Sequence, residues 1–160
     1  MKEPQFWYDK TISIPLIKKI SLWLLSLFFS MGGFFKKTFT STVSVSKPVI
    51  CIGNLTVGGA GKTPATFSIA QFFKGQGMQV AIISRGYTGS LQGPLKIDPT
   101  LHSAQEVGDE PLLLASLVTT WISKSRYKGA QKAIEEGADI ILLDDGLQHH
   151  TLKQDLKICV

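Results

Sequence analysis

Cysteine and charge are both scarce in this chain. Only two of its 160 residues are cysteines, Cys51 and Cys159, which excludes a disulfide scaffold and a cysteine zinc site. Both lie in apolar runs, which predicts small buried thiols. Because 18% of the residues are charged and 44% are apolar, the chain is not intrinsically disordered. Its length suits about one domain with a sizeable core.

Excess positive charge is confined to the N-terminal region. Residues 1–47 hold seven lysines and two acids, whereas residues 48–160 hold ten basic and ten acidic side chains. A nucleic-acid-binding protein is expected to spread basic residues over its folded surface, so this distribution argues against nucleic acid as a partner. We therefore divide the chain into an N-terminal membrane-association arm, residues 1–47, and a domain, residues 48–160.

The arm contains sixteen consecutive uncharged residues, 20–35, between Lys18-Lys19 and Lys36-Lys37. As a helix this stretch would reach about 24 Å, which is short for a hydrocarbon core of about 30 Å. Its aromatic residues and flanking lysines favour an interfacial helix at a membrane surface. A helix buried within the protein and a short membrane span are the alternatives. A secretory signal peptide is disfavoured because no small-residue cleavage site follows.

Apolar runs alternate with helical patterns after residue 47. The predicted strands are Val49–Gly53, Val80–Ser84, a weaker Val118–Ile122, Ala138–Gly146 and Leu156–Val160. The predicted helices follow Pro64, begin at Glu110 and cover Gly129–Ala138. This alternation predicts an α/β fold with a parallel sheet and helices on both faces. Since the chain ends in a strand that no helix covers, we expect the sheet to be incomplete.

A glycine-rich turn joins the first predicted strand to the first helix and ends in Gly61-Lys62-Thr63, the end of a P-loop. Glycines let successive backbone N–H groups surround the β-phosphate of a nucleotide. Lys62 would pair with the β- and γ-phosphates, and the Thr63 hydroxyl would hold Mg²⁺. The general pattern has glycine where this chain has Thr56, and a turn that binds nothing is the alternative. The predicted nucleotide-binding residues of this turn are Thr56, Val57, Gly58, Gly59, Ala60, Gly61, Lys62 and Thr63.

A P-loop also requires an acid at the end of a neighbouring strand, where it helps to hold Mg²⁺. Asp144 follows the apolar run Ile140–Leu143 and meets this requirement. Together, the turn and this acid predict a P-loop NTPase-type sheet that binds a nucleoside triphosphate with Mg²⁺.

Four motifs narrow the choice of P-loop protein. They are the loop Gly58–Pro64, Ser84-Arg85-Gly86-Tyr87, Val107-Gly108-Asp109-Glu110-Pro111 and Asp144-Asp145-Gly146-Leu147-Gln148-His149. With them, essentially the whole chain resembles the tetraacyldisaccharide 4'-kinases of lipid A biosynthesis, in which the departure at Thr56 is normal. The resemblance implies ATP and Mg²⁺, a tetraacyldisaccharide 1-phosphate whose 4'-hydroxyl is phosphorylated, and a monomer. It also implies a peripheral or monotopic position on the cytoplasmic face of the inner membrane.

The resemblance also implies roles for single residues. Asp109 would be the general base for the sugar hydroxyl, and Arg85 would neutralise phosphate charge beside Lys62. Glu110 would join Thr63 and Asp144 at the metal, and the nucleotide would further contact Asp145, Gln148 and His149. The alternatives are that Asp109 belongs only to a helix N-cap and first turn, and that Arg85 forms a surface salt bridge. Zinc at His149-His150 is disfavoured because no third ligand stands at a suitable spacing.

Two rival interpretations stay open. Members of the resembled family are much longer than this chain, so we expect an N-terminal half that binds nucleotide weakly and does not turn over. A catalytically dead remnant is then the first rival. The second is a membrane-associated P-loop switch ATPase, which would carry a lysine at the position of Val57.

Overall fold

A computed structural model of the chain describes residues 20–27, 42–54, 61–147 and 151–160. The chain divides into two compact units, Met1–Thr40 and Ser41–Val160. In the first unit, residues 20–27 are helical and all are exposed. The rest of the uncharged stretch, 28–35, lies outside the described residues. No helix in the described ranges is long and apolar enough to cross a membrane.

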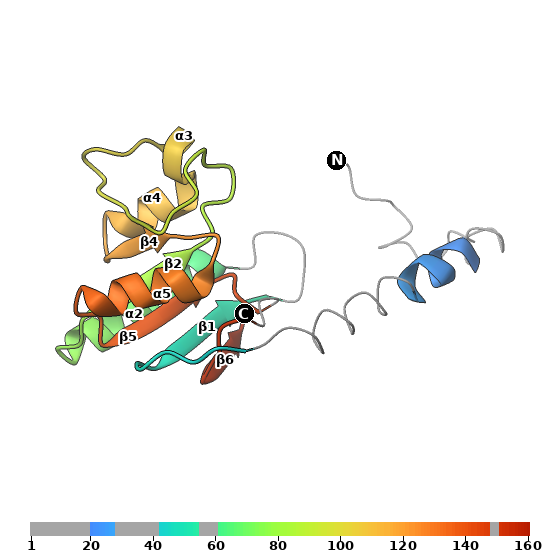
Figure 1. Cartoon of the computed structure of the whole chain (residues 1–160), viewed down its shortest axis with the longest axis horizontal. Coiled ribbons are helices and arrows are strands. Elements are labelled where there is room, and N and C mark those ends of the chain that lie inside the picture. The colour runs from blue at the N-terminus through green and yellow to red at the C-terminus, as the bar shows by residue number, and fades with distance from the viewer. Residues whose placement is uncertain (1–19, 28–41, 55–60, 148–150) are drawn as a thin grey trace. The chain divides into compact units, whose positions relative to one another are not determined.

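The second unit is built on a six-stranded sheet with the order β3-β4-β2-β5-β1-β6 (Figure 1). The strands are β1 (Val49–Gly53), β2 (Val80–Ser84), β3 (Leu95–Lys96), β4 (Thr120–Ile122), β5 (Ile140–Asp144) and β6 (Leu156–Cys159). All neighbours pair in parallel except β3 and β4, which are antiparallel. The predicted parallel sheet is confirmed. The antiparallel strand β3 was not predicted, because a two-residue strand is too short to leave a periodic signal.

The helices of this unit are α2 (Lys62–Gly75), α3 (Ala104–Val107), α4 (Asp109–Ala115) and α5 (Arg126–Glu135). Helix α5 begins three residues before its predicted start, because the Ser125 hydroxyl caps it by accepting the Lys128 N–H at 3.4 Å. The short α3 was not predicted. It is held by a capping box in which Ser103 and Glu106 satisfy each other's backbone N–H groups.

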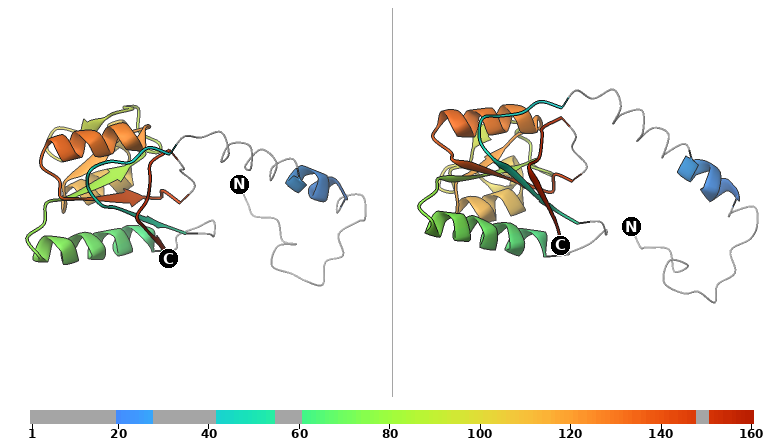
Figure 2. Two further views of the ribbon diagram at one scale, coloured as in Figure 1. Left: turned by 60° about the horizontal axis from the view of Figure 1, so that its bottom comes forward. Right: turned by 90° about the horizontal axis from the view of Figure 1, so that it is seen from below.

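Helices cover both faces of the sheet, as predicted. Figure 2 shows α5 on one side and α2 on the other, and α4 packs on the same face as α2. Along β1 the side chains alternate: Val49 and Cys51 belong to the core under α5, whereas Ile50 and Ile52 belong to the core under α2. Cys51 is buried as predicted, but Cys159 is exposed on the edge strand β6.

Strand β5 lies between β1 and β2, so Asp144 at its end and Asp145 after it lie beside the end of β1. The register aligns Ile52 with Asp144, which brings the carboxyl ends of β1 and β5 to the same level. In open α/β sheets ligands bind outside the carboxyl ends of the strands. The end of the predicted phosphate loop, Gly61-Lys62-Thr63, and the acid Asp144 therefore belong to the same end of the sheet.

Candidate functional site

A lysine and an acid from distant parts of the chain meet at the end of the sheet where the parallel strands have their carboxyl ends. The Nζ of Lys62, the first residue of α2, lies 3.0 Å from an Oδ1 oxygen of Asp145, which follows β5. Gly61 precedes Lys62 with a φ of 75°, a left-handed conformation that favours glycine and turns the chain into α2. Lys62 and the β5 acids therefore lie on the same side of the sheet.

Asp144 is the most deeply buried acid at this end of the sheet, with 4% of its surface exposed. The hydroxyl of Thr66, one turn into α2, donates to an Oδ1 oxygen of Asp144 at 3.5 Å. The pKa of Asp144 is raised to about 6, chiefly by burial and in part by the charges of Glu110 and Asp145, against the opposing charges of Arg126 and Lys62. A buried carboxyl with acidic neighbours favours a cation beside it.

Next to these acids lies a cavity of about 490 Å³. Its lining consists of Ser84, Arg85, Tyr87, Thr88, Asp109, Glu110, Pro111, Arg126, Asp144 and Asp145. The cavity brings together Arg85, Asp109, Glu110, Asp144 and Asp145, which the sequence analysis places in one site although they belong to three separate motifs. The cavity thus groups four carboxylates, of Asp109, Glu110, Asp144 and Asp145, with the guanidinium of Arg85.

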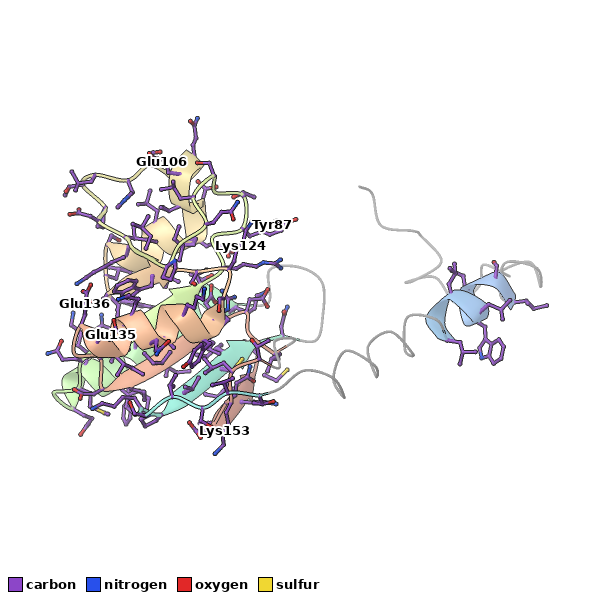
Figure 3. All side chains as sticks on the ribbon, viewed as in Figure 1. Tyr87, Glu106, Lys124, Glu135, Glu136 and Lys153 are labelled. Atoms are coloured by element: carbon purple, nitrogen blue, oxygen red, sulfur yellow. The ribbon has the colours of Figure 1, made fainter. Side chains whose placement is uncertain are left out.

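Asp109 enters this cavity from the first turn of α4. The N-cap of α4 is Gly108, and Asp109 lies with Glu110 in the first turn, so the first-turn alternative for this acid stays open. A Cβ at Gly108 would lie 2.8 Å from the carbonyl oxygen of Tyr87, so glycine permits the loop after β2 to approach α4. Tyr87 itself is 80% exposed and projects outward from that loop (Figure 3). Arg85 makes no ion pair with any acid that the structure describes.

Several predicted site residues lie outside the described residues, and their roles stay predictions. They are Thr56, Val57, Gly58, Gly59, Ala60, Gln148 and His149. Thr63 is described and lies half-buried in the first turn of α2. No cluster of three or more His, Cys, Asp or Glu within the described part of the chain could hold a metal ion. Mg²⁺ needs no such cluster, since it binds through one or two carboxylates, waters and substrate phosphates.

Two residues at this end of the sheet, Thr66 and Arg126, were not predicted from the sequence. Thr66 is fully buried against Asp144, and Arg126 is 2% exposed although it lines the cavity. Neither belongs to a recognised motif. The sequence held one indication of a site role for Arg126. It comes shortly after the predicted strand Val118–Ile122, and residues that follow parallel strands lie at the same end of the sheet as the other site residues.

Comparison with known proteins identifies the family. A sequence profile described as tetraacyldisaccharide-1-P 4'-kinase matches residues 18–160. The chain belongs to this family. It is 42% identical over 161 aligned residues to the tetraacyldisaccharide 4'-kinase of Parvibaculum lavamentivorans, covering 100% of this chain and 47% of that protein. It is 50% identical over 113 residues to the tetraacyldisaccharide 4'-kinase of Hyphomonas neptunium, covering 71% of this chain and 34% of that protein.

The fold agrees with that of a solved 4'-kinase. The crystal structure of LpxK from Aquifex aeolicus in complex with ATP matches with a TM-score of 0.73 and 36% identity, over 84% of this chain and 44% of that one. The chain thus spans about half the length of the 4'-kinases it matches, 47% of the Parvibaculum protein. Membership of the 4'-kinase family argues against the switch-ATPase interpretation.

Proposed function

We propose that the cavity belongs to a kinase site that transfers the γ-phosphate of ATP to the 4'-hydroxyl of a tetraacyldisaccharide 1-phosphate. The observation that carries this proposal is the ion pair of Lys62 and Asp145 beside the buried Asp144, at a cavity that also holds Asp109. The ATP complex of the Aquifex protein supports ATP as the donor. The names of the matched relatives support the lipid acceptor.

On the donor side, Lys62 would leave Asp145 and pair with the β- and γ-phosphates as ATP enters. Thr63 and Asp144 would hold Mg²⁺, with Glu110 close by. These residues fit the ion, because burial and the charges of Glu110 and Asp145 raise the pKa of Asp144 to about 6, and a bound cation would favour the ionised carboxylate. When bound, Mg²⁺ neutralises the charge that develops on the phosphate oxygens.

On the acceptor side, Asp109 would accept the proton of the sugar hydroxyl. The hydroxyl oxygen then forms a bond to the γ-phosphorus, the bond from that phosphorus to the bridging oxygen breaks, and ADP leaves with the electron pair. Arg85 lines the same cavity and would neutralise phosphate charge. The chain's own residues thus supply a base and a cation for the transfer.

We further propose that the arm holds this site at a membrane surface. Ile20, Leu22, Trp23, Leu24, Leu25 and Leu27 are each between 44% and 64% exposed on the helix of residues 20–27. A helix that exposes apolar side chains all round needs an apolar partner. Lys18-Lys19 and Lys36-Lys37 flank the uncharged stretch and suit anionic headgroups. An acceptor with acyl chains lies in that same surface.

The kinase proposal is tested with two variants and two ligands. Lys62→Ala is expected to weaken Mg·ATP binding by about 10- to 100-fold, because it removes a charged partner of the phosphates. It should leave binding of tetraacyldisaccharide 1-phosphate in detergent micelles unchanged. Asp109→Ala should weaken binding of the tetraacyldisaccharide 1-phosphate and leave Mg·ATP binding unchanged, because Asp109 would contact the acceptor and not the nucleotide. Titration calorimetry measures both ligands, and Lys74→Ala, in the last turn of the same helix, is the control.

Each half of the proposal can fail separately. If Lys62→Ala binds Mg·ATP as tightly as the unmodified chain, the phosphate-loop assignment is wrong. If micelles with and without the disaccharide bind equally, the lipid acceptor is wrong.

A further inference from the structure

Arg126 is a buried arginine that the proposed chemistry leaves without a role. It is the first residue of α5 and is only 2% exposed, yet it lines the cavity. Its Nη2 donates to the carbonyl oxygen of Asp144 at 3.1 Å, and its Nη1 donates to that of Ser123 at 3.3 Å. Its Nε is buried and has no hydrogen-bond partner among the described residues. The guanidinium therefore joins the end of β5 to the loop after β4.

The backbone that Arg126 contacts is strained. Asp145 has a φ of 53°, a left-handed conformation that is uncommon for a residue other than glycine. Two further contacts hold the same turn: the Asp145 N–H donates to the Ile52 carbonyl at 3.0 Å, and the Gln154 side chain donates to the Gly146 carbonyl at 2.9 Å. Such strain persists only where the surroundings over-determine it. In this turn it directs the Asp145 carboxylate to Lys62.

Packing alone does not account for an arginine at this position. The other buried residues of α5 are Gly129, Ala130 and Ala133, all small and uncharged. Arg126 forms no ion pair within 4.0 Å with a described carboxylate, and its hydrogen bonds go to main-chain carbonyls. Burying a guanidinium without such a pair costs free energy that an apolar side chain would avoid. The hydrogen bond of Arg126 to the Asp144 carbonyl, beside the left-handed Asp145, gives a reason for an arginine at this position.

We propose that Arg126 is a positioning residue of the nucleotide site, which fixes the turn after β5 so that Asp144 and Asp145 face α2. The inference rests on the proposed function, because it assigns Arg126 to the acids that serve Mg·ATP. Arg126 acts through the Asp144 carbonyl and not through contact with the nucleotide.

The test compares ATP affinity with and without Mg²⁺ in Arg126→Met and Arg126→Lys. Residues that orient metal ligands typically change metal affinity by about 10- to 100-fold, so we expect Arg126→Met to weaken Mg·ATP binding by that factor. ATP without Mg²⁺ should bind as before, because the phosphate loop is unaltered. Arg126→Lys keeps the charge and a donor for one carbonyl, so it should lose less. Ala133→Gly, on the same buried side of α5, is the matched control.

Thermal unfolding of each variant separates positioning from folding. Ala133→Gly should lower the unfolding temperature with no change in Mg·ATP affinity. If Arg126→Met also loses stability but keeps its Mg·ATP affinity, Arg126 is structural and the inference is wrong. Failure of both Arg126 variants to fold would overturn it equally. If the unmodified chain binds no ATP at all, the proposed function fails first, which is a different outcome.

Discussion

At Asp144 the proposed function and the stability of the fold favour different protonation states. Its carboxyl group is buried beside two other acids, and the ionised form that a metal needs is the form that burial destabilises. The hydroxyl of Thr66 and the charges of Lys62 and Arg126 offset part of that cost. The residue therefore reduces the stability of the fold near neutral pH while serving the proposed site.

Asp144→Asn is expected to stabilise the fold near neutral pH and to weaken Mg·ATP binding. The pKa of Asp144 rises from 3.8 to about 6 on folding, which costs about 3 kcal/mol at about pH 7.5. Because the native pKa is the higher one, wild-type stability is greatest below the unfolded pKa and falls as pH rises through the native pKa. The advantage of asparagine should thus shrink by about half between about pH 7.5 and about pH 5.

Urea unfolding of both proteins at the two pH values measures that difference. Other titrating groups are common to both proteins and cancel. An advantage of equal size at both pH values would contradict a raised pKa for Asp144.

At the scale of the element, the depth at which α5 packs is set by a glycine. A Cβ at Gly129 would lie 2.8 Å from the Cβ of Ser123 and 3.0 Å from the Cγ2 of Ile83. Helix α5 therefore lies closer to β2 and to the loop after β4 than any other residue at this position would allow. Since Arg126 is the first residue of the same helix, this depth also decides whether its guanidinium reaches the Asp144 carbonyl.

Gly129→Ala is expected to destabilise the domain and to weaken Mg·ATP binding together. Overpacking of this kind costs about 1–3 kcal/mol, against a gain in helix propensity of about 1 kcal/mol. Gly75→Ala, at the end of α2 with nothing within 4 Å of the added Cβ, is the control and should be neutral or stabilising. Denaturant unfolding and calorimetry measure the two effects. A Gly129→Ala protein as stable as the Gly75→Ala protein would show that α5 can move without cost.

At the scale of the whole molecule, the chain combines two units of different character. The domain buries its apolar residues on both faces of the sheet, whereas the helix of residues 20–27 exposes them. The described helix of the first unit, residues 20–27, therefore leaves its apolar side chains exposed, whereas the second unit buries its own. Under the proposed function a membrane supplies apolar surroundings for that helix.

Trp23→Ser should weaken binding to vesicles that contain phosphatidylglycerol. Trp23 is 63% exposed, and losing a large apolar side chain from the interface costs about 2 kcal/mol, or about 30-fold in partition. Mg·ATP affinity should not change. Ser26→Ala, on the same helix, is the control because it removes only a hydroxyl that donates to the Trp23 carbonyl. Co-sedimentation measures partition, and equal sedimentation of both variants would contradict a membrane role for this helix.

The sequence alone predicted the central strands and the site motifs. Strands β1, β2 and β5 are continuous apolar runs, a pattern typical of strands buried on both faces. The phosphate loop follows β1 in the sequence and Asp144 ends β5, so the parallel arrangement was enough to predict that Lys62 and Asp144 lie at the same end of the sheet. Each of these features lies within a short stretch of sequence, so a pattern of neighbouring residues is enough to predict it.

Only the tertiary structure decided the surroundings of these motifs. Thr66 and Asp144 are 78 residues apart, and Arg126 and Asp144 are 18 apart. No motif links them, because their contacts depend on how deeply α2 and α5 pack against the sheet. The raised pKa of Asp144 and the left-handed turn at Asp145 have the same origin. A sequence motif identifies which residues the chemistry needs. The pKa and the conformation of those residues depend on burial and on hydrogen bonds between segments that are distant in the sequence.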